Sequence, residues 1–173
     1  MRAIVRTACV AIACLCLAAG MAVAQPANMG CAPESSPNGS QTLRCEGGVI
    51  IVAENGARFT LQDRDGNGRV DSVELSSKAL LLEAPKKPGG NRFQVITPQA
   101  IAAVRGTKWA VDAADAKTSV FVVEGRVAVG RRKGSHSVTL GRGEGVDVEA
   151  AGPLTIKRWP AARVQALMAR LGR

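Results

Sequence analysis

Short valine-rich segments recur through the second half of the sequence, and glycine or other turn residues separate them. The clearest examples are residues 120–123 and 127–129, in which β-branched and small residues dominate. Strand-length segments at this spacing are typical of all-β sandwiches, barrels and solenoids. The pattern therefore predicts a mainly β fold with a packed core, and it leaves open whether the strands form a sandwich or a solenoid.

Two further strand-like segments precede this region. Residues 49–52 are a β-branched run, residues 58–61 alternate polar and apolar side chains, and the turn signal Asn55-Gly56 lies between them. Residues 73–84 fit either a buried strand or a helix, and the proline- and glycine-rich residues 85–91 predict a loop. We assign residues 47–157 to a single β domain.

The first 24 residues have the features of a secretory signal. Arg2 and Arg6 precede an apolar run from Ala8 to Ala19, and Ala22-Val23-Ala24 provides the small residues that a signal peptidase requires. The apolar run is short for a transmembrane span, so an uncleaved membrane anchor is the less favoured alternative. We expect cleavage before Gln25 and a periplasmic or secreted product without a transmembrane anchor.

Residues 25–46 lack a sustained apolar period, and the sequence predicts an irregular arm there. Cys31 and Cys45 lie in this segment, and in an oxidising compartment we expect them to form a disulfide that stabilises the fold by about 3 kcal/mol. Two unrelated buried thiols are the weaker alternative. A metal site is weaker still, because no histidine lies near the two cysteines.

The charge and aromatic content bear on the kind of partner. The net charge of +9 suits an anionic partner, although it also suits an ordinary solvated surface. Three phenylalanines, two tryptophans and no tyrosine are too few for a platform on which bases or sugars could stack. We therefore expect no nucleic acid, and a partner that is a protein or polymer of the periplasm or cell envelope.

Residues 158–173 are predicted to contain one amphipathic helix. Pro160 is a favoured first helical residue, and Gly172 is a favoured stop. The apolar residues recur at helical spacing: Val164, Leu167, Met168 and Leu171. We expect this stripe to pack on the β core, and the alternative is a helix that binds a partner or a membrane surface.

The most specific motif is the twelve-residue segment from Asp63 to Glu74. It matches the calcium loop of EF-hand proteins, in which oxygen ligands occupy alternate positions and a glycine, here Gly68, makes a sharp turn. The predicted metal ligands are Asp63, Asp65, Asn67, Arg69, Asp71 and Glu74. Arg69 would contribute its backbone carbonyl, Asp71 would act through water, and Glu74 would supply two oxygens.

The alternative for this segment is a polar turn that joins two strands. The residues before Asp63 resemble a strand, so the entering helix of an EF-hand is missing. We expect a calcium ion at this loop to have a structural role.

The sequence predicts no catalytic site. His136 is the only histidine, it lies in a predicted turn, and no thiol or carboxylate is fixed beside it to form a triad. The glycine-rich residues 141–145 lack the following helix that a phosphate cradle needs. An exported hydrolase is the least supported alternative, and it would require a carboxylate pair in a deep pocket.

Several short motifs follow one another between residues 93 and 148. They are Thr97-Pro98, Val104-Arg105-Gly106-Thr107, the alternating segment from Thr118 to Gly125, and Gly143-Glu144. In this order they resemble the FecR domain, the extracytoplasmic module of iron-responsive signal regulators. The resemblance implies a β fold and a role in binding or sensing in the periplasm.

Well-known members of that family are anti-sigma regulators with a cytoplasmic helical part, a transmembrane helix and a receptor-contacting domain. Here the predicted signal stands directly before the β domain, so we expect a stand-alone exported module, and the iron-signalling role is not implied. The alternative is a calcium-stabilised structural or adhesion protein that uses residues 63–74.

The FecR-like motifs also carry local expectations. Gly106 is expected at a turn or at a positive φ. Glu124-Gly125 and residues 143–145 are expected at hairpin ends. A buried Arg105 would need a carboxylate such as Glu124 or Glu144.

Overall fold

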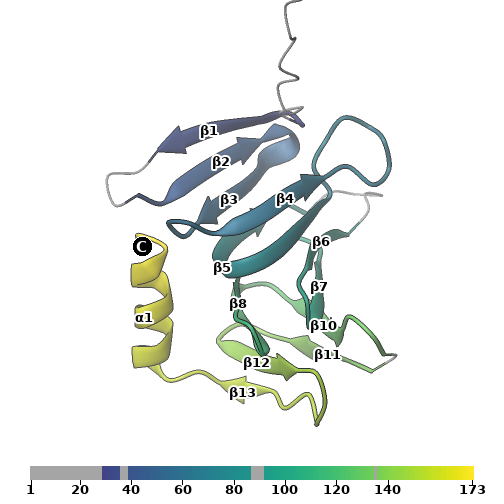
Figure 1. Ribbon diagram of the computed structural model, residues 1–173, viewed down its shortest axis with the longest axis vertical. Coiled ribbons are helices and arrows are strands. Elements are labelled where there is room, and N and C mark those ends of the chain that lie inside the picture. Colours follow the sequence, from purple (N-terminus) through teal and green to yellow (C-terminus); the bar gives the residue numbers. More distant parts are fainter. Residues whose placement is uncertain (1–28, 36–38, 87–91, 135) are drawn as a thin grey trace, which may run out of the picture.

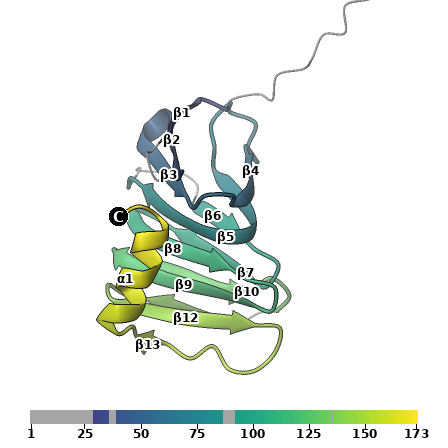
Figure 2. The ribbon, with the colours of Figure 1, turned by 60° about the vertical axis from the view of Figure 1, so that its left-hand side comes forward.

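The computed structural model describes residues 29–35, 39–86, 92–134 and 136–173. Thirteen strands form one curled sheet, and helix α1 (Ala161–Arg170) lies against its outer side (Figures 1 and 2). The predicted mainly β class with one C-terminal helix is confirmed. The predicted signal peptide, residues 1–24, lies outside the described residues.

The order of the elements along the chain is simple, although their pairing is not. The strands are β1 (Cys31–Ser35), β2 (Gln41–Cys45), β3 (Val49–Ala53), β4 (Arg58–Gln62), β5 (Ser72–Ala84), β6 (Phe93–Ile96), β7 (Ala100–Val104), β8 (Thr107–Ala113), β9 (Lys117–Glu124), β10 (Val127–Arg131), β11 (Ser137–Leu140), β12 (Glu144–Glu149) and β13 (Lys157–Arg158). A short 3-10 turn, Glu46–Gly48, joins β2 to β3.

Strand β5 belongs to both halves of the sheet, and the segment that fitted strand or helix is therefore a strand. Its first part pairs with β4 and with the parallel strand β6, and its second part pairs with β3 and β8. Between the two parts Lys78 has a φ of 66°, a left-handed conformation that bends the strand. One half of the sheet continues through β7, β10 and β11, and the other through β9, β12 and β13.

The two halves enclose one apolar core. Along most strands alternate residues point inward, and they include the valines that the sequence pattern predicted as core, together with Trp109, which is fully buried. Fully buried valines include Val73, Val95, Val111, Val120, Val122, Val127, Val129 and Val148. Because side chains from both halves meet in this cluster, the fold resembles a sandwich made from one sheet.

The N-terminal strands correct one prediction. The segment 25–46 was expected to be irregular, but β1 and β2 form an antiparallel pair and β2 pairs with β3. Cys31 and Cys45 face each other in register, with Cα atoms 3.8 Å apart, and form the predicted disulfide. Pairing with β3 and this cross-link outweigh the weak strand propensity of the proline- and serine-rich sequence. Residues 25–28 and 36–38 lie outside the described residues.

The glycine turns of the FecR-like motifs differ from expectation in one respect. Gly106 has the expected positive φ, 70°, at the turn between β7 and β8. Glu124-Gly125 is not a hairpin end, because β9 and β10 do not pair and lie in different halves of the sheet. The turn at Gly143, between β11 and β12, likewise joins the two halves. Arg105 is exposed, so it does not need the buried carboxylate partner that a core position would require.

Helix α1 packs on the outer face of the sheet, as its apolar stripe predicted, and crosses the strands (Figure 2). Leu167 and Leu171 are buried against outward-facing residues of β3, β5, β8 and β9. Near the end of the helix the guanidinium of Arg170 pairs with Asp112 and Glu54, with N–O distances of 2.7 Å to each. Both carboxylates raise the pKa of Arg170 further above its ordinary range.

Within the described part of the chain, no helix combines the length and apolar character that crossing a bilayer requires.

Candidate metal centre

The loop between β4 and β5 is organised around the carboxylate of Asp63. Its two oxygens accept hydrogen bonds from the backbone N–H groups of Gly66 (2.8 Å), Asn67 (3.1 Å) and Gly68 (2.7 Å). Gly66 and Gly68 have φ values of 71° and 81°, which other residues rarely adopt, and this conformation turns the chain around the carboxylate. Desolvation opposes the shift, but these backbone donors outweigh it and lower the pKa of Asp63.

Three of the predicted ligands lie together. One carboxylate oxygen from each of Asp63, Asp65 and Asp71 lies within 4.8 Å of the others. Asp71 Oδ1 also accepts the backbone N–H of Arg64 at 3.1 Å, which ties the end of the loop to its start. Asn67 follows on the same turn, and its Oδ1 accepts the backbone N–H of Arg69 at 2.9 Å. These donors are hard oxygens, and their chemistry fits calcium better than zinc or copper.

Glu74, the last predicted ligand, is engaged elsewhere. Its Oε1 pairs with Nη1 of Arg132 at 3.1 Å, and its Oε2 accepts a hydrogen bond from Gln62 at 3.4 Å. Glu74 belongs to strand β5, where successive side chains point to opposite faces, so it points away from the face shared by Asp71 and Val73. In an EF-hand a helix follows the loop and returns this residue to the ion. The predicted role of Arg69 concerned its carbonyl, and its side chain lies 3.5 Å from Glu46.

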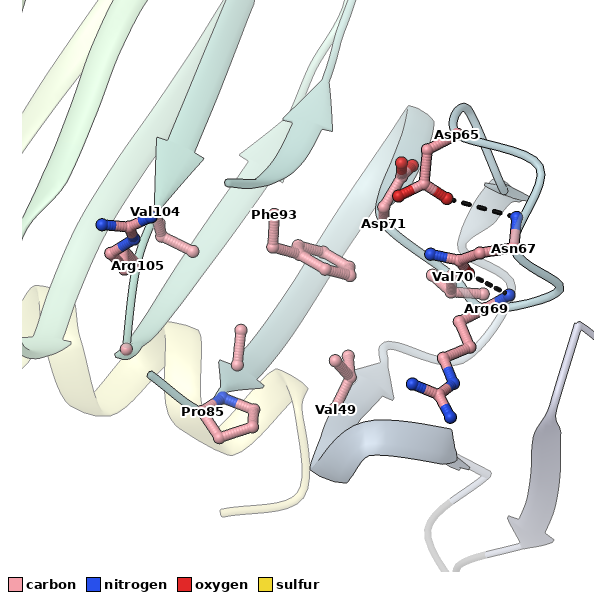
Figure 3. Close-up of a pocket in the computed structure, with 12 residues that line it drawn as sticks. Val49, Asp65, Asn67, Arg69, Val70, Asp71, Pro85, Phe93, Val104 and Arg105 are labelled. Atoms are coloured by element: carbon pink, nitrogen blue, oxygen red, sulfur yellow. Dashed lines mark hydrogen bonds between the residues drawn. The ribbon is translucent and has the colours of Figure 1, made fainter. Parts of the chain in front are cut away.

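A cleft of about 230 Å³ adjoins the loop (Figure 3). Asp65 and Asp71 line one side and Arg105 the other, with Phe93 and Val104 between them (Figure 3). Arg69 lies on the same side as the two aspartates, so the cleft places a side of mixed charge opposite Arg105 across an apolar floor. Its sides come from sequence segments about forty residues apart, which the spacing of the loop alone did not reveal.

His136 is exposed in the turn between β10 and β11, as the sequence predicted. A buried polar network that the sequence did not predict lies at the same end of the sheet, where the backbone N–H of Arg132 donates to the carbonyl of Gln99 at 2.9 Å. The hydroxyls of Thr97 and Thr118 are 2.8 Å apart, and Thr118 donates to Oε1 of Gln99 at 2.8 Å. Thr97 follows β6 in one half of the sheet and Thr118 belongs to β9 in the other, so their contact connects the two halves. Both threonines belong to the FecR-like motifs.

The family comparison agrees with this fold. The model of the FecR protein family matches residues 34–128, which are 95 of the 173 residues. The match begins well before the region 93–148 on which the resemblance was based and ends before Leu140. It therefore includes strands β2 to β9, with the loop at Asp63, in the same family unit. No curated protein matches the chain.

Two similar solved structures are crystal structures of a candidate anti-sigma factor from Parabacteroides distasonis. They superpose with TM-scores of 0.62 and 0.60 at 22% and 20% sequence identity, over 80% and 79% of this chain. The chain spans 64% of the length of each of those proteins. At this identity the likeness concerns the fold, and it extends the agreement beyond the segment that the family model matches. On the family match over more than half of its length, this chain belongs to the FecR protein family.

Proposed function

We propose that this chain is a non-catalytic sensory or binding module that works in the periplasm or cell envelope through contact with a protein or polymer there. The observation that carries the proposal is a FecR-family fold closed by the disulfide between Cys31 and Cys45. Disulfides persist in oxidising compartments and are rare in the cytosol. The predicted signal at residues 1–24 supports the same compartment.

A protein is the first candidate among these partners. The solved relatives are described as candidate anti-sigma factors, and an anti-sigma factor works by binding another protein. The structure offers a broad β surface with several polar turns, which suits recognition of a macromolecule.

Export can be tested by expressing the full sequence in a bacterial host and measuring the mass of the product in the periplasmic fraction by mass spectrometry. We expect a chain that begins at Gln25 and whose two thiols do not react with an alkylating reagent until a reductant is added. A variant with Ala24→Trp, which blocks signal cleavage, is the control. Recovery from the cytosol of an uncleaved chain, with all five of its thiols reactive without a reductant, would contradict the proposal.

The protein partner can be sought with a photo-crosslinking residue placed at exposed positions of the sheet. A discrete protein that crosslinks from one face, and not from the opposite face, supports a binding module. Uniform or absent crosslinking from all faces argues against one.

A second candidate function rests on the loop at Asp63, which we propose holds a structural calcium ion in an envelope or adhesion protein. The proximity of three carboxylates supports it. Titration with calcium chloride, followed by calorimetry and by the melting temperature, tests it. Binding should weaken in the double variant Asp65→Asn/Asp71→Asn and persist in Asp115→Asn, an exposed carboxylate outside the loop. If millimolar calcium produces no heat of binding and no shift in the melting temperature, this function is excluded.

A further inference from the structure

Five exposed cations lie on neighbouring turns at one end of the curled sheet. We call this group the basic end, and its members are Lys86, Arg105, Arg126, Arg142 and Arg158. They come from five separate segments of the sequence, so neither a charge run nor a motif marks them as a group. The strand pairing brings them together, because it places the end of β7 and the starts of β8, β10, β12 at one end of the sheet.

The first three cations lie on turns that touch. A methyl group placed on Gly106 would come within 2.7 Å of Cβ of Lys86. A methyl group on Gly125 would come equally close to the carbonyl oxygen of Gly106. The hydroxyl of Thr107 donates to the carbonyl of Arg126 at 2.9 Å. The turns that carry Lys86, Arg105 and Arg126 are therefore packed together.

The remaining two cations continue the same surface toward β13. The turn with Arg142 is held by a hydrogen bond from the backbone N–H of Gly143 to the carbonyl of Val122, at 2.9 Å. Arg158 lies opposite Glu144 in the register of β12 and β13, and its Nη1 would lie 3.0 Å from a methyl group on Gly143. The cations thus extend over both halves of the sheet, from Arg105 at the cleft beside the acidic loop to Arg158 in β13.

The basic end has a net positive charge. Three carboxylates lie beside these cations: Glu124 is exposed, and Glu144 accepts the backbone N–H of Gly141 at 2.7 Å. The third, Glu83, pairs with Lys108 at 3.4 Å, so that pair adds no net charge. In the described part of the chain, Lys86, Arg126, Arg142 and Arg158 form no salt bridge. The arginines of helix α1, by contrast, hold the fold together through ion pairs.

We propose that the basic end binds the anionic surface of a phospholipid bilayer. The cations form a two-dimensional array on the ends of strands about 5 Å apart, and this suits a plane of headgroups better than an extended acidic peptide, which needs a line or groove. Guanidinium groups pair well with phosphate oxygens. Among the described residues the one exposed large apolar side chain is Ile156, outside the basic end, so binding involves headgroup contact without insertion.

The test compares vesicles of phosphatidylcholine with vesicles of equimolar phosphatidylcholine and phosphatidylglycerol. It uses the chain from Gln25, which contains every described element. We expect sedimentation with the anionic vesicles only, weakened by salt at about 0.15 M. Because each basic residue near an anionic surface strengthens binding about fivefold, the triple variant Arg126→Gln/Arg142→Gln/Arg158→Gln should bind on the order of a hundredfold more weakly.

The matched control is Arg58→Gln/Lys117→Gln/Lys133→Gln, which removes the same charge from the opposite end of the strands. It should bind nearly as well as the unaltered chain, and both triple variants should keep their melting temperatures. Equal losses in the two variants, or equal binding to both kinds of vesicle, overturn the proposal. Binding to soluble poly-glutamate but not to anionic vesicles also overturns it and assigns the basic end to an acidic polymer.

Discussion

The indole of Trp159 occupies the space that any side chain at Gly145 would need. A methyl group built on Gly145 would overlap Nε1 of Trp159, and it would also come within 2.7 Å of the carbonyl oxygen of Val120. Trp159 in turn stacks on Phe121, with ring centroids 5.0 Å apart. The glycine in β12 therefore allows the chain before α1 to pack closely on the sheet.

We expect Gly145→Ala to lower the free energy of unfolding by about 3 kcal/mol, because a backbone carbonyl blocks the simplest relaxation. Chemical denaturation measures this. Gly141→Ala is the control, because its added methyl group has no neighbour closer than 3.4 Å. A loss at Gly145 no larger than that at Gly141 would show that Trp159 can move aside.

The hydroxyl of Thr97 should stabilise the junction between the two halves of the sheet. It is 1% exposed, and its Oγ1 accepts the backbone N–H of Ala100 at 2.8 Å while it lies 2.8 Å from the hydroxyl of Thr118. Thr97→Val preserves the shape but leaves buried polar groups without a partner, so we expect a loss of about 2 kcal/mol in unfolding free energy.

The matched control for Thr97 is Thr60→Val in β4, where the side chain is exposed. This change should shift the unfolding free energy by less than about 0.5 kcal/mol. If the two variants have equal stability in urea denaturation, the buried network contributes little to the fold.

The bend in β5 predicts an unusual order of stabilities at Lys78. Its φ of 66° suits glycine better than alanine, so Lys78→Gly should be more stable than Lys78→Ala by about 1 kcal/mol. Both variants lose the hydrogen bond from Nζ to the carbonyl of Asn55, so their difference isolates the backbone conformation. At Glu83, which is paired in register with Ile50 and Lys108 in the same strand, the order should reverse, because glycine weakens an ordinary strand position. Thermal melting of the four variants checks both orders.

Sequence periodicity predicted the strands and the core well, because alternation and turn glycines are local properties. Val120 and Val122 are buried as their spacing implied, and the stripe of α1 that includes Leu167 lies on the sheet. The pairing of β5 with four strands was not predictable, since no local pattern states which distant strand is a neighbour. The same holds for β1, whose regular structure depends on β2 and on the disulfide.

In the candidate metal loop, the sequence motif predicted the positions of some ligands but not of the last one. Asp63, Asp65 and Asp71 lie together, as their spacing in the motif implied. A tight glycine turn produces this proximity whether a strand or a helix follows the loop. The position of Glu74 depends on whether a strand or a helix follows the loop. Here a strand follows, and Glu74 pairs with Arg132. The basic end was equally hidden, because its cations become neighbours only after the strands pair.

Arg163 fastens the start of α1 to the sheet, and this contact should depend on pH. Its guanidinium lies 3.6 Å from the ring centre of Trp159 and pairs with Oδ1 of Asp147 at 2.5 Å. Burial alone would raise the pKa of Asp147, but hydrogen bonds from Arg163 and Ser119 outweigh it and lower that pKa below its ordinary value of 3.8.

A carboxylate whose pKa is lower in the folded state stabilises the fold above its unfolded pKa, and this contribution disappears as the pH falls through the folded value. We therefore expect Asp147→Asn to cost about 1 kcal/mol of unfolding free energy at pH 7, a modest value because water screens this partly exposed pair. The difference between the variant and the unaltered chain should shrink as the pH falls below about 3.8. Urea denaturation across this range measures it.

Arg163→Gln should lose more than Asp147→Asn, because it also removes the contact with Trp159, which contributes about 1 kcal/mol. The double variant should be less destabilised than the sum of the single variants, since the two side chains form one ion pair. Strict additivity at pH 7, or a cost of Asp147→Asn that stays constant down to pH 3, would show that the pair does not fasten the helix. Lys133→Gln, an exposed cation in the β10–β11 turn, should leave both measurements unchanged.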